Sequence, residues 1–358
     1  QSDDDSMQSP TEVTVFGGYF PFASRYSLDV PVLFNQYGLK AIWDQEYAAV
    51  GVKHISAGAW DPCHFATKDP VNSLADLEGK RVFVTGGGTG IGEAIVSAFV
   101  AQGATVAFVD IAREASEALA ARLGNDGSTA PVFRHCDITD IPALQRTMRE
   151  LAEQLGDFDV LVNNAAFALP GAVEDMPRGA LRSIFEASLF GTHDLTVRLI
   201  PHFRENGGRI VNISSVLGLI GIRWRGPYVA TKFALEGLTD VLRLEMAGTP
   251  VKVILIEPGP IASRIRANAI PHFERWVNWQ NSARADEYRA SLLKRLYEPA
   301  AKKDRFELHP SAVSDRIVHA LTAARPRPRY YVTTPTWMSG TARRLLPTRA
   351  LDWFARHG

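Results

Sequence analysis

A tyrosine and a lysine four residues apart, Tyr228 and Lys232, are the pair in this sequence best suited to acid–base chemistry. They lie in the stretch 227–246, whose apolar residues recur at helical spacing. On a helix, residues i and i+4 share a face, so the phenol and the ammonium point the same way. A phenol has an ordinary pKa of about 10, and a nearby positive charge favours the phenolate. The spacing therefore predicts that Lys232 moves the pKa of Tyr228 down, toward the working range of a general acid–base group.

A serine, Ser215, adds a hydroxyl upstream of this pair. It follows the apolar run 209–213, which is typical of a buried parallel strand, and it lies thirteen residues before Tyr228. Parallel sheets bind their ligands outside the carboxyl ends of their strands. We therefore expect the Ser215 hydroxyl to face Tyr228 across such a crevice.

A glycine-rich stretch, TGGGTGIG at 85–92, lies between a short apolar strand (81–84) and a helix (93–101). Glycines let the backbone approach a pyrophosphate, and the N-terminus of the helix offers N–H donors and the positive end of its dipole. In this strand–loop–helix context the stretch predicts a dinucleotide site. Its expected contact residues are Gly86, Thr89, Gly90, Ile91 and Gly92.

From about Leu77 to the C-terminus, the sequence resembles the classical short-chain dehydrogenase/reductases. The motifs that carry this resemblance are 85–92, Asn163-Asn164-Ala165-Ala166, Ser215, Tyr228, Lys232 and Pro258-Gly259. It implies an α/β fold, a Rossmann-type doubly wound parallel sheet, with an N-terminal extension. It also implies an NAD(P)-dependent hydride transfer between nicotinamide and a secondary alcohol, ketone or aldehyde. Tyr228 would be the acid–base group, Lys232 would lower its pKa and hold the nicotinamide ribose, and Ser215 would bind the substrate oxygen.

The choice of coenzyme is expected to depend on Asp110, which follows the strand 105–109 about twenty residues beyond the glycine-rich loop. A carboxylate there hydrogen-bonds the ribose 2′-hydroxyl of NAD and repels a 2′-phosphate. We expect NAD, with NADP as the alternative. Asp110 could instead cap the next helix, and Arg113 could favour NADP.

Further cofactor contacts follow from the resemblance alone. Asp137 and Ile138 would meet the adenine, and Asn163 and Ala165 would close the fourth strand against the cofactor. After the sixth strand, the cofactor contacts would be Pro258, Gly259, Ile261 and Ser263, with the backbone near Ile261 and the hydroxyl near Ser263 binding the nicotinamide carboxamide. Ala166 replaces the glycine of the family motif, which we expect to tighten a turn without abolishing it. Pro258-Gly259 would also fit an ordinary turn.

One catalytic position departs from the family pattern. Many members have an asparagine in the long helix before the serine strand, where it anchors a water that links the lysine to solvent. In this sequence Ser188 stands there, three residues before Gly191. A serine binds water with a shorter reach, so we expect a modified proton relay.

The elements that must position these residues alternate between strands and helices, which implies right-handed crossovers and a parallel sheet. The predicted strands are 81–85, 104–109, 131–136, 158–163, 208–214, 251–257 and 329–333. The predicted helices are 90–102, 113–123, 140–155, 179–205 and 227–247. By resemblance, the polar and aromatic segment 261–310 covers the substrate, and the two long helices pair subunits in a homodimer or homotetramer.

Composition limits the alternatives. The chain has 358 residues, of which 46% are hydrophobic and 22% charged, and this fits one large domain plus an extra segment. Its formal net charge is zero, so the sequence shows no excess of basic residues of the kind that binds nucleic acid. We find no apolar run long enough to span a bilayer, and no signal-peptide pattern at the start of the chain. Two cysteines, Cys63 and Cys136, favour a reducing, cytoplasmic compartment. Cys63-His64 has no second pair at zinc spacing, so we expect no metal site.

Both ends of the chain leave alternatives open. Residues 1–10 are predicted to be a disordered tail and 11–76 an accessory segment, with the dehydrogenase domain at 77–358. Residues from about 30 to 81 resemble a fragment of a TRAP-type periplasmic solute-binding protein. A chimera that binds a dinucleotide or a small carboxylate without turnover is therefore the alternative function. The stretch 337–357 fits a helix packed near the substrate entrance or an interfacial membrane helix.

Overall fold

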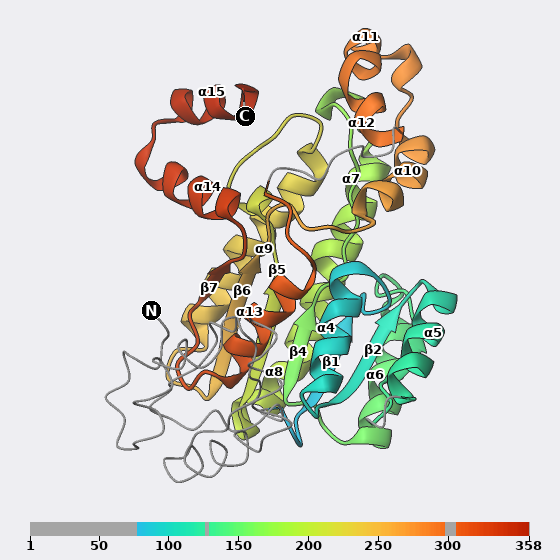
Figure 1. Ribbon diagram of the computed structural model, residues 1–358, viewed down its shortest axis with the longest axis vertical. Helices are drawn as coiled ribbons and strands as arrows, with labels where there is room; N and C mark the ends of the chain where they lie inside the picture. Colours follow the sequence, from blue (N-terminus) through green and yellow to red (C-terminus); the bar gives the residue numbers. More distant parts are fainter. Residues whose placement is uncertain (1–76, 126–128, 298–305, 358) are drawn as a thin grey trace, which may run out of the picture. The chain divides into compact units, whose positions relative to one another are not determined.

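The computed structural model describes residues 77–125, 129–297 and 306–357 (Figure 1). The chain divides into two units, Gln1–Leu74 and Ala75–Gly358, and all that follows concerns the second. The predicted tail, the accessory segment and Cys63-His64 lie outside the described residues.

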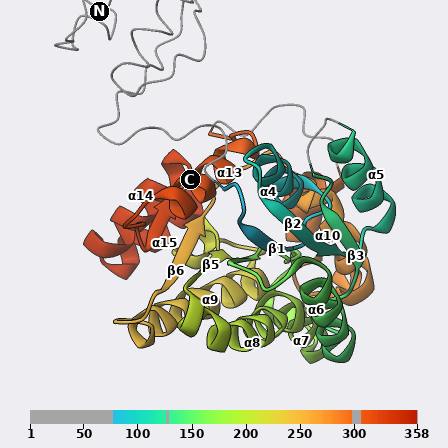
Figure 2. The ribbon, with the colours of Figure 1, turned by 90° about the horizontal axis from the view of Figure 1, so that it is seen from below.

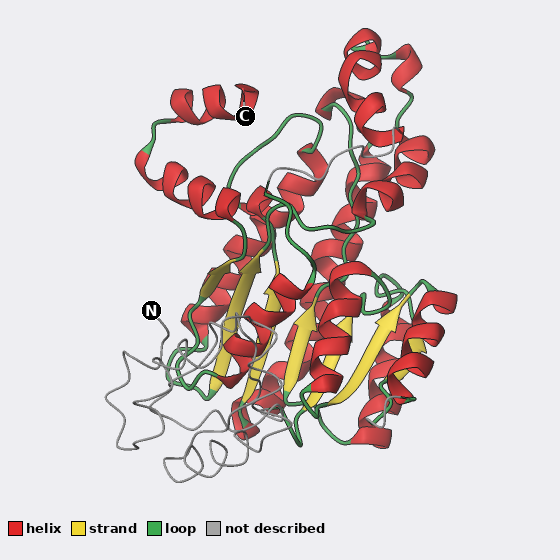
Figure 3. Cartoon of the chain, viewed as in Figure 1, coloured by secondary structure: helices red, strands yellow, loops and turns green. Residues whose placement is uncertain are grey.

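A seven-stranded parallel sheet forms the centre of this unit, in the order β3-β2-β1-β4-β5-β6-β7 (Figure 3). Because the strand order reverses between β1 and β4, the sheet is a doubly wound Rossmann-type sheet whose crevice lies at the carboxyl ends of these strands. This confirms the predicted fold class. The strands are β1 (Arg81–Thr85), β2 (Thr105–Asp110), β3 (Val132–His135), β4 (Val160–Asn163), β5 (Gly208–Ile213), β6 (Val251–Glu257) and β7 (Arg329–Tyr331).

Helices cover both faces of the sheet (Figure 2). One layer contains α4 (Gly90–Ala101), α5 (Arg113–Gly124) and α13 (Ser311–Thr322), whose apolar side chains share a core cluster with the strands. The other contains α6 (Ile141–Leu155), α8 (Gly191–Asn206) and α9 (Gly226–Glu245), which cover the opposite face. Burial on both faces explains why the centres of β1 and β4 read as continuous apolar runs.

The long helix predicted at 179–205 is interrupted, which corrects that prediction. It consists of α7 (Arg178–Phe185), a π-helical turn η4 (Glu186–Phe190) and α8. A π-turn widens the hydrogen-bond ladder at one place and leaves the apolar spacing on either side nearly unchanged, so periodicity does not reveal it. The turn packs against α9, the helix that carries Tyr228.

A cap of short helices extends beyond the carboxyl edge of the sheet (Figure 1). It comprises α10 (Ile265–Trp276), η6 (Trp279–Asn281), α11 (Ala285–Glu287), η7 (Tyr288–Leu292) and α12 (Leu293–Tyr297). Its centre is Tyr288, a fully buried ring whose hydroxyl donates to Asp175 (2.8 Å) and accepts from the Ala172 amide (2.7 Å). These bonds tie the cap to the segment around η3 (Val173–Asp175).

Two helices complete the chain, α14 (Thr334–Leu345) and α15 (Thr348–His357). Arg343 attaches α14 to the body, because its guanidinium donates to the Leu219 carbonyl and lies over the ring of Phe233 on α9, 4.6 Å from the ring centroid. Leu219 follows the short 3₁₀ helix η5 (Val216–Gly218). Of the helices that the structure describes, none is long and apolar enough to span a membrane.

Candidate active site

The first two turns of α9 carry the tyrosine and the lysine. The helix begins with Pro227 in its first turn, a position where a missing N–H costs nothing. Tyr228 and Lys232 are both buried, with 9% and 3% of their surfaces exposed. The Lys232 ammonium donates to the Ile213 carbonyl at the end of β5 (2.7 Å) and lies 5.6 Å from the centroid of the Tyr228 ring. The helical spacing therefore brings the two groups together as predicted.

The pKa of Tyr228 differs from our prediction. Burial raises it to about 12, and a hydrogen bond with Ser215 and the charge of Arg225 only partly offset this. The physical reason is desolvation, which penalises the phenolate more than nearby groups favour it. At neutral pH the phenol is therefore protonated and suited to donate a proton, as a general acid does when a carbonyl is reduced. Burial also lowers the pKa of Lys232 to about 8, although the negative charge of Glu236 acts to raise it.

Ser215 lies where the strand pattern places it, two residues beyond β5 and beside Tyr228. It is the N-cap of η5, and its Oγ accepts from the Leu217 amide (3.1 Å). The hydroxyl therefore has a fixed position while keeping its own proton to donate.

Ser188, the residue in the family's asparagine position, lies in the π-helical turn. Its side chain is buried, and its Oγ has no partner among the described residues. A buried hydroxyl without a partner is costly unless a water or ligand completes its hydrogen bonds. Ser188 is thus on the element that packs against α9, as a relay requires, but no direct bond joins it to Lys232.

The glycine-rich loop between β1 and α4 has the shape that a pyrophosphate needs. Gly86 has a φ of +65°, and a Cβ on Gly92 would lie 1.8 Å from the Gly86 carbonyl oxygen, so neither position accepts a side chain. Thr89 is the N-cap of α4 and makes no side-chain cap bond, which leaves the first-turn N–H groups available to an anion. These residues fit the diphosphate of a dinucleotide.

Asp110 ends β2 beside this loop. Its carboxylate accepts from the Gly88 amide and from the Ala112 amide, both at 2.8 Å. The N-cap of α5 is Ala112, so Asp110 is not the helix cap that we considered as an alternative. A carboxylate accepts about four hydrogen bonds, so two acceptor positions remain for a ribose hydroxyl. Arg113 is exposed and 3.7 Å from Glu117.

The two adjacent asparagines at the end of β4 make different contacts. The Asn163 side chain is buried, and its Nδ2 donates to Thr196 Oγ1 (3.1 Å) and Asn212 Oδ1 (2.8 Å), while its Oδ1 has no partner among the described residues. Asn164, which the sequence reading did not single out, donates to the Gly86 carbonyl (2.7 Å) and positions the glycine-rich loop. Strand alternation could have indicated this division, because successive side chains point to opposite faces.

Ala165 closes the loop from the other side, since a Cβ on Gly86 would lie 2.8 Å from the Ala165 Cα. Among non-glycine residues that the structure describes, Trp224 alone has a positive φ. Ala166 therefore has an ordinary backbone conformation in which a glycine is not required.

The segment after β6 faces the same loop. The Pro258 carbonyl accepts from the Val216 amide (2.7 Å), and a Cβ on Gly259 would lie 2.0 Å from Thr333 Oγ1, so only glycine fits there. Ile261 forms a bridge with Leu308. Ser263 is exposed, and its Cβ lies 3.7 Å from where a Cβ on Gly90 would be. The fold thus brings the first and last predicted cofactor segments together.

The predicted adenine contacts lie beyond β3. Asp137 is exposed, and its carboxylate accepts from the amide and the hydroxyl of Thr139, both at 2.9 Å. Ile138 is buried in a core cluster and packs against Gly191 at the start of α8. The Ile138 side chain therefore contributes to the core, and its contact with adenine stays a prediction.

A buried charge cluster lies one turn beyond Lys232, and the sequence reading missed it. The Arg329 guanidinium binds Glu236 and Asp240 (2.6 Å) on α9 and Glu257 (2.6 Å) at the end of β6. Glu257 has no exposed surface, and burial together with the charge of Glu236 raises its pKa to about 8. The four residues come from three elements, so no local pattern connects them.

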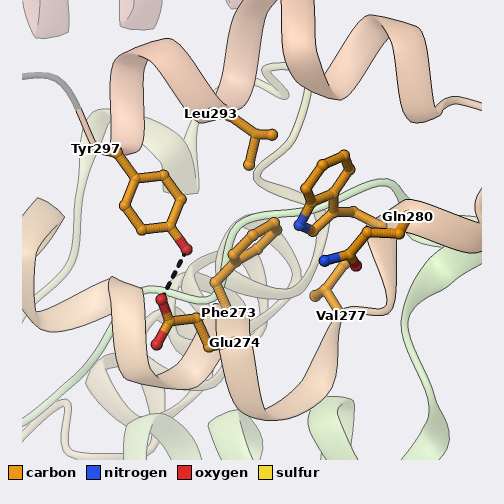
Figure 4. Close-up of a pocket in the computed structure, with 7 residues that line it drawn as sticks. Phe273, Glu274, Val277, Gln280, Leu293 and Tyr297 are labelled. Atoms are coloured by element: carbon orange, nitrogen blue, oxygen red, sulfur yellow. Dashed lines mark hydrogen bonds between the residues drawn. The ribbon is translucent and has the colours of Figure 1, made fainter.

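The cap contains a separate pocket of about 480 Å³ (Figure 4). At its rim the Tyr297 hydroxyl donates to Glu274 (2.9 Å). None of the three residues Ser215, Tyr228 and Lys232 lines this pocket, so the pocket lies apart from the reacting groups. Its lining residues are Phe273, Glu274, Val277, Trp279, Gln280, Leu293 and Tyr297. The described residues contain no group of side chains that could hold a metal ion.

Comparison with known proteins decides the family. Residues 80–272, more than half of the chain, match the family model described as short chain dehydrogenase. The chain belongs to the short-chain dehydrogenase family. This confirms the resemblance that the motifs indicated. The comparisons give no support to the resemblance of residues 30–81 to a solute-binding protein, and Leu77 is buried in the core of the dehydrogenase unit.

The chain is similar to several members with different names. It is 39% identical over 193 residues to the uncharacterized oxidoreductase YbbO of Escherichia coli K12, covering 54% of this chain and 65% of YbbO. It is 38% identical over 184 residues to L-fucose dehydrogenase of Bos taurus, covering 51% and 66% of the two chains. The probable galactose dehydrogenase GalD of Rhizobium meliloti is 34% identical over 228 residues, covering 63% and 86%. The match thus spans slightly less than two-thirds of the first two relatives.

Solved structures share the fold. A short-chain dehydrogenase from Streptomyces avermitilis is 28% identical, with a TM-score of 0.63 over 78% of this chain and 97% of that one. A short-chain dehydrogenase/reductase from Burkholderia phymatum, solved in complex with NAD, has a TM-score of 0.64 at 22% identity, over 79% and 97% of the two chains. The second likeness concerns the fold alone.

Proposed function

We propose that this protein is an NAD(P)-dependent oxidoreductase that interconverts a secondary alcohol and a ketone, or a primary alcohol and an aldehyde. The observation that carries the proposal is the convergence of three side chains at the carboxyl edge of the sheet. Ser215 is hydrogen-bonded with Tyr228, and Lys232 lies one turn further along the same face of α9, with its ammonium near the ring. Family membership and the shape of the glycine-rich loop support the same reading.

Each side chain has one task in this proposal. Ser215 donates to the substrate oxygen and orients it. Tyr228 passes its proton to that oxygen during reduction and takes it back during oxidation. Lys232 keeps a positive charge near the phenol and binds the ribose next to the nicotinamide. The bound nicotinamide supplies the hydride chemistry, while the chain supplies position and proton transfer.

Absorbance at 340 nm tests the proposal against the non-catalytic alternative. A panel of secondary alcohols, polyols, ketones and aldehydes, offered with NAD(H) and NADP(H), should contain members that change the absorbance. Binding of either coenzyme, without turnover of any member, would favour a binding module and contradict the proposal.

The coenzyme preference should follow Asp110. We expect native protein to prefer NAD(H), because the carboxylate accepts from a ribose 2′-hydroxyl and repels a 2′-phosphate. Asp110→Ala should narrow the ratio of kcat/KM for NADH over NADPH. Asp110→Asn is the matched control for loop structure, because it removes the charge but keeps an oxygen acceptor for the Gly88 amide. Tighter binding of NADPH than NADH by native protein would show that Asp110 does not set the choice.

We also propose a homodimer or homotetramer assembled through the long helices. Support comes from exposed apolar side chains along α8 and α9, among them Val197, Leu238, Val241 and Leu244. Val241 is 52% exposed. Val241→Glu should shift sedimentation toward the monomer, whereas Ile111→Glu, an exposed apolar position beyond β2, should not. A native protein that sediments as a monomer at micromolar concentration would contradict this assembly.

The domain boundaries and the cellular location also remain proposals. We propose that the dehydrogenase domain begins near Leu77 and that 11–76 form an accessory segment. A cytoplasmic location stays a prediction that rests on the two cysteines.

A further inference from the structure

One arginine beside Tyr228, Arg225, has no acidic partner among the residues that the structure describes. Arg225 is the N-cap of α9, three residues before Tyr228, and it is half-buried. Its charge acts on the Tyr228 phenol, so the guanidinium lies within electrostatic reach of the reacting hydroxyl. No carboxylate among the described residues contributes to its electrostatics. The charges that act on it are those of Arg295, Arg266 and Tyr228.

The backbone that carries Arg225 is fixed on both sides. Arg225 forms a bridge with Gly171, and the Gly171 amide donates to the Trp224 carbonyl (2.9 Å). Trp224 itself has a φ of +67°, a conformation that costs a bulky residue about 1 to 3 kcal/mol. The Trp224 ring packs on Tyr288, with 4.7 Å between ring centroids. A strained residue held by the cap thus fixes the direction in which the chain enters α9.

Two more arginines reach the same place from the cap. Arg266 lies in the first turn of α10 and Arg295 lies on α12, and both guanidinium groups oppose the charge of Arg225. Each also makes an interaction of its own. Burial and these like charges lower the pKa of Arg225, so the positive charge there is costly in the free protein.

Such an arrangement is explained by an anionic ligand. An arginine pairs with a carboxylate or phosphate through two parallel hydrogen bonds, and it is favoured over lysine for buried pairs of this kind. Two other partly buried arginines already have acceptors. Arg329 binds three carboxylates, and Arg209 donates to the Ala320 and Ala323 carbonyls.

We infer that Arg225 is a substrate-binding residue, and that the substrate is a carbonyl compound or alcohol with an anionic oxygen group, a carboxylate in the simplest case. The inference rests on the proposed function and specifies its substrate class. The anionic group would lie on the cap side of Tyr228. The reacting carbon would remain between Ser215 and Tyr228.

The test compares acids with their neutral esters. Acetoacetate, levulinate and 4-carboxybenzaldehyde, each paired with its methyl ester, are offered to the native protein with NADH, and kcat/KM is measured for every compound. For at least one pair we expect the acid to be preferred. Arg225→Gln should lower the acid-to-ester ratio by roughly 10- to 100-fold, the range of a charge-assisted hydrogen bond. Arg225→Lys, which keeps the charge but loses the planar fork, should lower it less.

A matched control and a second measurement separate the outcomes. Arg223→Gln removes an exposed arginine two residues away, which pairs with Glu287, and it should leave the ratio unchanged. Using the ratio cancels any effect of Arg225 on the phenol, because both substrates share that step. If Arg225→Gln does not fold, the native protein and Arg225→Lys decide, together with inhibition of ester reduction by benzoate but not by benzamide.

The inference and the proposed function fail in different ways. Reduction of the esters with no preference for any acid would overturn the anionic subsite and leave the oxidoreductase intact. A preference for acids that Arg225→Gln does not change would also overturn it. Failure to reduce every acid, every ester and every member of the neutral panel would overturn the proposed function, and the inference with it.

Discussion

Replacing Tyr228 with phenylalanine lowers turnover by about 10²- to 10⁴-fold, the usual loss when a general acid–base group is removed. The ring remains and keeps its packing in the cluster around Leu169 and Phe273, so the fold and the affinity for NAD(H) should be nearly unchanged. The loss should therefore appear in kcat at saturating coenzyme. Steady-state kinetics together with coenzyme titration by protein fluorescence measure both quantities.

The pH dependence of the native enzyme distinguishes the two directions. With the pKa of Tyr228 raised to about 12, the phenol donates readily at neutral pH, whereas its phenolate becomes available only in alkali. Carbonyl reduction should therefore proceed at pH 7, and alcohol oxidation should accelerate as the pH rises. A Tyr228→Phe protein with near-native kcat would remove Tyr228 from the mechanism.

Replacing Arg329 with methionine has the largest expected effect on stability. The change leaves the buried Glu236 without its counter-charge and the buried Glu257 without its hydrogen-bond donor, and removing one partner of a buried ion pair costs about 3 to 5 kcal/mol. Arg243→Met is the matched control, because Arg243 makes only a partly exposed pair with Asp240 at 3.0 Å, worth about 0.5 kcal/mol. Urea denaturation of the two variants measures the difference in the free energy of unfolding. Equal stabilities would show that the cluster does not hold β7 and α9 together.

The same cluster gives stability a pH dependence of known sign. The pKa of Glu257 is about 8 in the folded protein and 4.5 without its surroundings, so between these values the folded state holds a proton that the unfolded state has lost. The protonation of Glu257 therefore adds its full stabilising contribution to the free energy of unfolding below pH 4.5, and this contribution is lost as the pH rises through 8. Glu257→Gln, which resembles the protonated form, should remove that decline. A native profile and a variant profile with the same slope from pH 5 to 8 would be the contrary result.

The sequence was most informative where chemistry depends on local spacing. A spacing of four positions places Tyr228 and Lys232 on one helix face, and the glycines of 85–92 are needed where a Cβ would collide with the loop itself. Strand ends were predictable for the same reason, because apolar runs stop where Ser214 and Pro258 begin. These features depend on residues a few positions apart.

Features that depend on distant parts of the chain were missed. The pKa of Tyr228 was predicted in the wrong direction because spacing reveals the neighbouring lysine but not the burial that outweighs it. The Arg329 cluster joins β7 to α9 and β6, and the π-turn at Ser188 changes the hydrogen-bond pattern over a single turn, which is too short for periodicity to reveal. The binding role inferred for Arg225 was missed for the same reason, because only the folded chain brings Arg266 and Arg295 of the cap within electrostatic reach of it.

The central claim, hydride transfer beside Ser215, Tyr228 and Lys232, is tested most directly by following the hydride itself. NADH deuterated at nicotinamide C4, on one face or the other, is incubated with the best carbonyl substrate of the panel, and the alcohol product is analysed by mass spectrometry. We predict one deuterium at the carbinol carbon from only one of the two labelled forms, at a rate that Tyr228→Phe lowers about 10²- to 10⁴-fold. An alcohol without deuterium from either form, or NADH that binds while every carbonyl stays unreduced, would contradict the claim.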